Sequence, residues 1–279
     1  MARSSASSVV PNGEFAQRAS SRGQIALVLL SSAGAALGLL ALLGVAVSPA
    51  LASLVLLSLI SLISLGVFWL PSGVFARPLL SANTTRQEIA LTFDDGPSGA
   101  QTRSILDVLE ARGHRATFFV VGATAERDPA LLAEIAQRGH AVENHSWFHS
   151  YLTPFMNPTH LAAELERTSA LIESRCGKRP RWFRPPVGIL SPNIAAAAEL
   201  AGLDLAGWSG TARDGVASRT IDDALLRLTR ALKPGAVLVL HDGAVQGGRV
   251  SIAAQLLPRL LDLLAERDLR SVTLEELLA

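Results

Sequence analysis

Two neighbouring aspartates, Asp94 and Asp95, directly follow an apolar run of the chain. Adjacent carboxylates repel one another unless a positive group lies beside them, so we expect a metal ion or a cationic side chain nearby. If one carboxylate binds a metal ion, the other stays free to act as a general base. The alternative is an Asp-Gly turn that only closes a strand.

A pair of histidines, His145 and His149, follows a later apolar run. Because they are four residues apart, they would share one face of a helical turn and converge on one ion. With one carboxylate they would form an open metal site that leaves positions for water and substrate. The spacing also resembles that of a zinc-protease helix, but Ser146 stands where that chemistry needs a glutamate. Two partly exposed imidazoles are the alternative.

A cation and a third histidine complete the set of reactive side chains. Arg184, which two prolines follow, would hold Asp94 ionised and oriented if the two lie side by side. His241 follows the apolar run Val237–Leu240 and is the natural second proton carrier. In isolation, Arg184 could be a surface cation and His241 a structural core histidine.

Regular elements must bring these side chains together, and from Glu88 onward short β-prone runs alternate with helical patterns. The predicted strands are Ile89–Phe93, Thr117–Val121, Ala141–Asn144, Trp182–Arg184, Leu203–Trp208, Val237–Leu240 and Ser271–Thr273. The predicted helices are Thr102–Arg112, Pro129–Arg138, Pro158–Arg175, Pro192–Ala201, Ile221–Leu232 and Ile252–Glu266. This alternation predicts a parallel α/β sheet or a small, incomplete barrel. In such folds reactive groups lie at the C-terminal ends of the strands, where the groups above occur.

The combination of motifs resembles the polysaccharide deacetylase family, also called the NodB-homology group or carbohydrate esterase family 4. The resemblance runs from about Glu88 to Ala279. It rests on five motifs in family order, which are Thr92 to Pro97, His145 to His149, Arg184 to Gly188, Asp214, and Leu238 to His241. It implies a distorted (β/α)7 barrel that hydrolyses an N-acyl group from an amino sugar with the help of one divalent metal ion.

The resemblance also implies a role for each matched residue. Asp94 is the implied base, and Arg184 holds it in place. His241 is the implied acid, and Asp214 orients it and adjusts its acidity. The implied metal ligands are Asp95, His145 and His149. The residues expected to contact the substrate or its oxyanion are Val187, through its backbone N–H, Trp208 and Leu238.

Two positions depart from the family pattern. Val187 stands where the family usually has tyrosine, and Gly215 stands where a tryptophan often follows the fourth-motif aspartate. Val187 is expected to keep the backbone contact but to lose a side-chain contribution to the sugar pocket. Gly215 is expected to leave its wall of the groove more open. Zinc suits the ligand set, and so do other divalent metals. An ester-cleaving or deformylating hydrolase on the same fold is the alternative activity. An inactive sugar-binding homologue is a further alternative, which the complete set of reactive residues disfavours.

Two uncharged apolar segments, Ile25–Val47 and Leu51–Leu70, precede this region. Each is long enough to cross a hydrocarbon core of roughly 30 Å. We therefore predict a flexible leader at residues 1–24, a transmembrane helical hairpin at 25–70, a linker at 71–87 and the deacetylase-like domain at 88–279. A cleaved signal peptide is the alternative for the first segment.

Basic residues flank the hairpin on both sides, whereas its connecting loop is uncharged. They are Arg18 and Arg22 before it and Arg77 and Arg86 after it. Positive flanks stay in the cytoplasm, so both ends of the hairpin and the domain are predicted to lie there. If the first segment is cleaved, or only one segment spans, the domain faces outward.

Composition agrees with a membrane protein that acts on carbohydrate. The mean hydropathy is +0.34, which is high for a soluble protein of this length. The net charge is +1 and no basic face is clustered, so no nucleic-acid partner is expected. The single cysteine, Cys176, excludes an intrachain disulfide and a cysteine-based zinc site. The expected partners are a carbohydrate substrate and the membrane.

Overall fold

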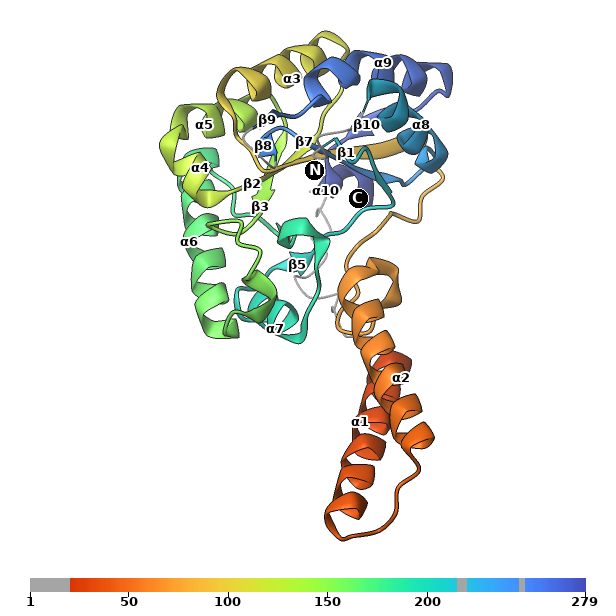
Figure 1. Ribbon diagram of the computed structural model, residues 1–279. Helices are drawn as coiled ribbons and strands as arrows, with labels where there is room; N and C mark the ends of the chain where they lie inside the picture. The colour runs from red at the N-terminus through yellow and green to blue at the C-terminus, as the bar shows by residue number, and fades with distance from the viewer. Residues whose placement is uncertain (1–20, 215–219, 246–248) are drawn as a thin grey trace, which may run out of the picture.

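The computed structural model describes residues 21–214, 220–245 and 249–279, which form an α/β domain and two long helices that project from it (Figure 1). Most of the predicted leader, including Arg18, lies outside the described residues. The same holds for Gly215, so the second departure from the family pattern is not part of the described structure.

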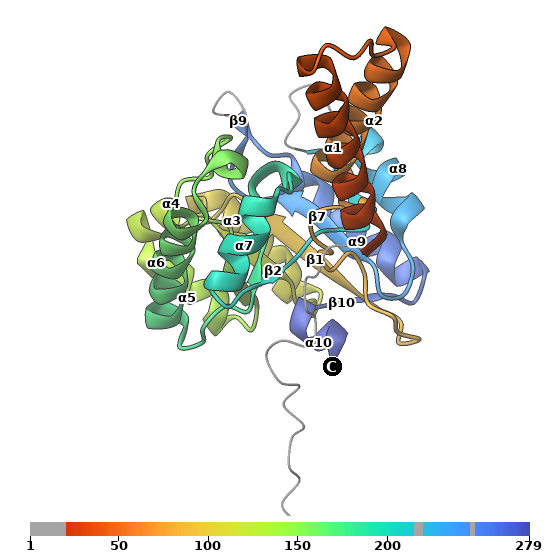
Figure 2. The ribbon, with the colours of Figure 1, turned by 90° about the horizontal axis from the view of Figure 1, so that it is seen from below.

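The α/β domain is built on one curled sheet in which all the strands are parallel (Figure 2). The strand order is β5-β4-β3-β2-β1-β7-β6, and β10 pairs with the start of β1. The strands are β1 (Glu88–Asp94), β2 (Thr117–Val120), β3 (Ala141–Asn144), β4 (Trp182–Phe183), β5 (Asp204–Leu205), β6 (Gly210–Thr211), β7 (Val237–His241) and β10 (Arg270–Val272). The predicted distorted (β/α)7 barrel is confirmed, and its sheet stays open between β5 and β6. The short strand β6 and the hairpin of β8 (Ala244–Val245) and β9 (Arg249–Val250) were not predicted.

Helices cover the outer face of the sheet. They are α3 (Gly99–Ala111), α4 (Gly122–Arg127), α5 (Pro129–Gln137), α6 (Pro158–Cys176), α7 (Pro192–Leu200), α8 (Ile221–Ala231) and α9 (Ala253–Glu266). The last helix, α10 (Leu274–Leu278), packs instead against side chains of the barrel interior, such as Phe119 and Val237. Three of the helices begin at a proline that follows a capping side chain, namely Asp128, Asn157 or Ser191. Proline fits the first helical position and the cap satisfies a free backbone N–H, which is why these starts were predictable. The short helices α4 and α10 were not predicted.

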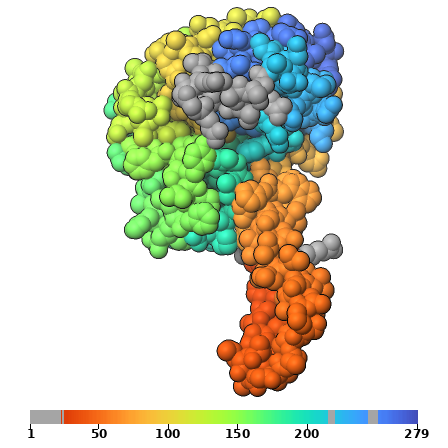
Figure 3. Space-filling view, viewed as in Figure 1, coloured from red at the N-terminus to blue at the C-terminus, as the bar shows by residue number. Residues whose placement is uncertain are grey.

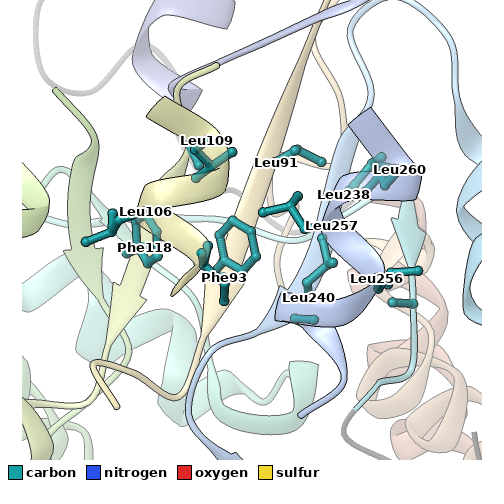
Figure 4. Close-up of a cluster of buried hydrophobic side chains, with 14 of the residues drawn as sticks. Leu91, Phe93, Leu106, Leu109, Phe118, Leu238, Leu240, Leu256, Leu257 and Leu260 are labelled. Atoms are coloured by element: carbon teal, nitrogen blue, oxygen red, sulfur yellow. The ribbon is translucent and has the colours of Figure 1, made fainter. Parts of the chain in front are cut away.

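Alternation along the central strands separates the core from the inside of the barrel. Leu91 and Phe93 of β1 and Leu238 and Leu240 of β7 belong to the large cluster under the helices (Figure 4). The Phe93 ring stacks on Phe118 with centroids 5.0 Å apart. Because successive side chains point to opposite faces, the residues between and after these leucines and phenylalanines face the interior of the barrel. That interior is where the polar groups gather.

The two N-terminal helices form a hairpin that stands away from the domain (Figure 3). They are α1 (Ser21–Leu42) and α2 (Pro49–Phe68), and Ser48 caps the second. Each contains an uncharged stretch of at least 18 residues with high mean hydropathy, and almost none of these residues is buried. By length and composition both could span a membrane, although a signal sequence would satisfy the same criteria for α1.

The segment that the sequence analysis treated as a linker is packed along the open side of the sheet. The N–H of Leu79 donates to the carbonyl of Leu205 at 2.9 Å, and the N–H of Gly207 donates to the carbonyl of Leu79 at 2.7 Å. Further along, the N–H of Ala82 donates to the carbonyl of Gly235 at 2.8 Å. Unpaired backbone groups at sheet edges need partners, and this segment supplies them. It therefore fixes the hairpin to the domain.

The first prediction concerns the core. Phe93 is fully buried, so the change Phe93→Ala should lower the free energy of unfolding by about 3–5 kcal/mol. Thermal unfolding of the full chain in detergent would measure it. The same change at Phe155, which is 81% exposed, is the matched control and should cost less than about 0.5 kcal/mol. Equal losses in the two variants would contradict the packing described here.

Candidate active site

The C-terminal ends of the strands open onto one cleft of about 1270 Å³. This volume exceeds the roughly 300–1,000 Å³ of typical small-molecule pockets, so the cleft has room for more than one sugar ring. Among its lining residues are Asp94, Asp95, His145, His149 and His241. The structure therefore brings together five side chains that the sequence analysis singled out from three separate motifs.

Arg184 is fully buried inside the barrel and contacts Asp94 directly. Its Nη1 donates to Asp94 Oδ1 and to Thr92 Oγ1, both at 2.7 Å, and its Nη2 donates to the carbonyl of Gly207 at 2.8 Å. Burial lowers the pKa of Arg184, and the neighbouring Asp94 carboxylate opposes that effect. A buried guanidinium requires a counter-charge, and Asp94 supplies it. The pairing gives the Asp94 carboxylate one fixed orientation at the floor of the cleft.

Asp95, His145 and His149 present three potential ligand atoms that all lie within 4.8 Å of one another. Asp95 Oδ1 is 3.3 Å from His145 Nε2 and 3.1 Å from His149 Nε2. That oxygen is buried, and no described residue forms a well-aligned hydrogen bond with it. Burial alone would raise the pKa of Asp95, but the interactions with His145, His149 and His241 lower it to about 2. An anionic oxygen and two imidazole nitrogens that converge on one point fit a divalent metal ion.

The backbone of Arg184 orients one of these imidazoles. His145 Nδ1 lies 2.7 Å from the carbonyl oxygen of Arg184. A carbonyl oxygen can only accept a hydrogen bond, so Nδ1 carries the proton. The lone pair of a neutral ring is then on Nε2, which is the atom that faces Asp95. A fixed tautomer of this kind is typical of histidines that bind metals.

The loop from His145 to His149 is not the helical turn that the four-residue spacing suggested. Ser146 and His149 have φ angles of 65° and 52°, in the left-handed region. Trp147 is buried between them, and the guanidinium of Arg167 stacks 3.4 Å from its ring centre. The two imidazoles therefore converge because an anchored loop turns the chain back, and helical periodicity has no part in it.

His241 borders the same cleft and is held by Asp214. In the strand register His241 of β7 pairs with Asp94 of β1. His241 Nδ1 is 2.8 Å from Asp214 Oδ1, while Asp214 Oδ2 accepts from the backbone N–H of His241 and from Ser251 Oγ. Burial alone would lower the pKa of His241, but the hydrogen bond and the charge of Asp214 raise it to about 9. At neutral pH this imidazole is therefore protonated and able to give up a proton.

Two of the three expected substrate contacts border the cleft. Val187 has a φ angle of 60° and is 53% exposed, and Trp208 lies beside it. Gly188 permits this approach, because a Cβ there would lie 2.2 Å from the Trp208 ring. The expectation for Leu238 is wrong, since that side chain is fully buried in the core (Figure 4).

Strand alternation explains the error at Leu238. Because His241 faces the cleft, the residue two positions earlier, Val239, shares its face and lines the cleft instead. The alternation of side chains along β7 therefore predicts that Val239, and not Leu238, faces the cleft.

Further cleft residues come from elements that the sequence analysis did not connect with the site. They are Phe68 and Trp69 at the end of α2, Tyr151 after the histidine loop, and Arg127, Arg213, Arg227 and Arg230. Arg227 and Arg230 are three residues apart on one predicted helix, which predicts a shared helix face. Nothing in the sequence indicated that this face borders the cleft, or that the hairpin does.

Comparisons with known proteins point to one family. The sequence profile of the family described as polysaccharide deacetylase matches residues 81–206. A chitooligosaccharide deacetylase from Bradyrhizobium sp. (strain ANU 289) is 36% identical over 162 residues, which cover 58% of this chain and 73% of the relative. The peptidoglycan-N-acetylglucosamine deacetylase PgdA of Listeria monocytogenes is 32% identical, but the match spans only 36% of its length.

Solved structures show the same domain. The Bc1960 peptidoglycan N-acetylglucosamine deacetylase, solved with a substituted benzamide, is 30% identical with a TM-score of 0.63 and covers 71% of this chain and 91% of its own. A family 4 acetyl xylan esterase from Clostridium thermocellum, solved with a cobalt ion, is 30% identical with a TM-score of 0.61 and covers 68% and 89%.

These similarities extend over most of the α/β domain and, for three of the four proteins, over 73–91% of the other protein's length. The Bradyrhizobium relative is a carbohydrate deacetylase, a hydrolase of carbon–nitrogen bonds other than peptide bonds. The fold and the sequence of this chain match that class. The chain belongs to the polysaccharide deacetylase family.

Proposed function

We propose that this chain is a metal-dependent deacetylase that removes the N-acetyl group from an amino sugar. The observation that carries the proposal is the cluster of Asp95, His145 and His149 beside the Asp94–Arg184 pair. Relatives named for N-acetylglucosamine or chitooligosaccharide deacetylation support the amino sugar as substrate. A complete set of metal ligands, base and acid disfavours an inactive sugar-binding role.

The ligands of the proposed metal ion are Asp95, His145 and His149. One carboxylate and two imidazoles suit zinc, and the cobalt ion in the xylan esterase structure supports the same family of divalent ions. A bound ion would supply Lewis-acid polarisation to the acyl carbonyl and to the attacking water. All three residues line the cleft, where both would have to bind.

The chain's own residues would carry the protons. Asp94, held in one orientation by Arg184, would accept the proton of the attacking water. The backbone N–H of Val187 would donate to the acyl oxygen as negative charge develops on it. His241, protonated because Asp214 raises its pKa to about 9, would give its proton to the leaving nitrogen. The products are acetate and a free amino sugar.

Ester cleavage is a second candidate, because the xylan esterase neighbour is as similar to this chain as the deacetylase neighbour. An ester leaving group is an alkoxide, and an amide leaving group is a far more basic nitrogen. A protonated His241 is needed more for the amide, which favours N-deacetylation over ester cleavage. Hydrolysis rates on acetylated xylan, N-formyl sugars and N-acetylated sugars would rank these activities.

For the membrane, we propose that both helices of the hairpin span it and that the domain lies in the cytoplasm. Arg77 and Arg86 follow the hairpin, while the loop between its helices is uncharged. A cytoplasmic site would act on precursors at the inner face rather than on finished cell-wall polymer. The hairpin would then concentrate the enzyme where a lipid-linked amino sugar is present.

The second prediction concerns the metal. One divalent ion per chain should be found by elemental analysis, and chelation should abolish acetate release until zinc is added. The double change His145→Ala and His149→Ala should remove the ion, because it leaves one ligand of three. The change His160→Ala, at an exposed histidine of α6, is the control and should keep it. Full activity of metal-free protein would contradict the proposal.

The third prediction concerns the division of work between the neighbouring aspartates. Asp94→Asn should keep the ion and slow turnover by about 10²–10⁴-fold, since it removes the base but no ligand. Asp95→Asn should weaken metal binding itself. His241→Ala should resemble Asp94→Asn, because it removes the acid. Metal content and turnover should be measured on the same folded samples. Loss of the ion from Asp94→Asn would mean that Asp94 is the metal ligand and Asp95 the base.

The fourth prediction concerns topology. A fluorescent protein that folds only in the cytoplasm, fused after Ala279, should fluoresce, and an export-dependent phosphatase at that point should stay inactive. The same reporters inserted before Pro49, between the two helices, should behave in the opposite way. An active phosphatase after Ala279 would show that the domain faces outward, which would make polymeric glycan the better substrate.

A further inference from the structure

Several arginines line the cleft, and three of them have no carboxylate in direct contact within the described part of the chain. Arg213, Arg227 and Arg230 lie on one wall. None of the three forms an ion pair within 4.0 Å with a described residue. Positive charge without a partner, concentrated in a concave site, attracts an anion.

The packing of α8 directs two of these arginines to the cleft. Ala224, Leu225 and Leu228 bury one face of α8 in the core, and Arg227, Arg230 and Ala231 line the cleft from another. The helix seats closely on β6, because a Cβ on Gly210 would lie 2.4 Å from the Cβ of Ala231. A well-packed helix therefore carries the two guanidinium groups.

The same wall adjoins the proposed acid. Thr211 of β6 pairs with Val239, which is two residues before His241. Arg213 is the immediate neighbour of Asp214, whose carboxylate holds the His241 ring. An anionic group bound by these arginines would therefore lie on the His241 side of the reacting amide.

The end of the membrane hairpin borders the cleft as well. Phe68 and Trp69 line it and are 73% and 55% exposed. The N–H of Leu190 donates to the carbonyl of Val67 at 3.2 Å, and a Cβ on Gly66 would lie 2.7 Å from the Phe75 ring. The last turn of α2 is thus fixed against the domain, so the cleft opens beside the exit of the proposed span. Exposed aromatic side chains at such an exit are typical of the membrane interface.

We propose that Arg213, Arg227 and Arg230 form a subsite for the phosphate or diphosphate that links the amino sugar to a membrane lipid. The inference rests on the proposed deacetylation and narrows its substrate to an anionic, membrane-anchored amino sugar. Guanidinium groups bind phosphate oxygens in pairs of parallel hydrogen bonds, which suits several arginines on one wall. A neutral polymer has no anionic group that these guanidinium groups could bind.

The test compares three substrates of the zinc-loaded full chain in detergent. They are the neutral methyl glycoside of N-acetylglucosamine, N-acetylglucosamine 1-phosphate, and N-acetylglucosamine diphosphoryl undecaprenol in mixed micelles. The double variant Arg227→Gln/Arg230→Gln should lower the ratio of kcat/KM for each phosphorylated substrate to that for the methyl glycoside by about 10–100-fold. The control Arg175→Gln/Arg270→Gln removes the same charge from exposed positions on α6 and β10 and should leave the ratio unchanged.

A binding measurement separates this inference from the deacetylase proposal. Inorganic pyrophosphate should bind the metal-free full chain in calorimetry, and the Arg227→Gln/Arg230→Gln variant should bind it at least tenfold more weakly than the control. An unchanged ratio and unchanged pyrophosphate affinity would overturn the subsite while hydrolysis of the methyl glycoside continued. Absence of hydrolysis with all substrates would overturn the deacetylase proposal and leave pyrophosphate binding to the arginines intact. If the lipid-linked sugar reacts no better than the soluble phosphate, the membrane anchor is not part of the substrate.

Discussion

A guanidinium group buried inside an apolar barrel is the constraint on which the site depends. Arg184 has no exposure to solvent, and its ring neighbours are Phe119 and Trp208. Removing a charge from water costs several kcal/mol unless a counter-charge and hydrogen bonds replace the water. Asp94 supplies the counter-charge, while Thr92 and the Gly207 carbonyl supply hydrogen bonds. The proposed base is therefore fixed by the same interactions that make burial of Arg184 tolerable.

Arg184 also orients a residue of the proposed metal site, through its backbone carbonyl. The carbonyl of Arg184 accepts from His145 Nδ1, so one short segment orients both the base and a metal ligand. Asp95 follows Asp94 directly but has a φ angle of 75°, which turns its carboxylate toward the imidazoles. Gly243 leaves room for this turn, because a Cβ there would lie 2.2 Å from the Asp95 carbonyl oxygen. The neighbouring carboxylates would repel one another, but Asp94 pairs with Arg184 while Asp95 faces the two imidazoles.

Sequence alone predicted the elements whose signals are local. The helix starts at Pro129, Pro158 and Pro192 followed from proline and capping side chains, and the reactive groups followed from their positions after apolar strands. Features set by tertiary contacts were not predicted. The turn that brings His149 to His145 depends on left-handed residues and on Trp147 packed under Arg167. Three further features depend on which elements meet in space. They are the pairing of residues 71–87 with the sheet and the cleft-lining side chains of α8 and of the end of α2.

Asp95, His145 and His149 are proposed to bind one divalent ion beside the proposed base, Asp94. Anomalous X-ray diffraction at the zinc absorption edge, from crystals of the zinc-loaded protein, tests it most directly. One strong peak is expected at about 2.0–2.2 Å from an Asp95 oxygen and from Nε2 of both histidines. A peak on other ligands, or no peak at this site in zinc-loaded crystals, would contradict it.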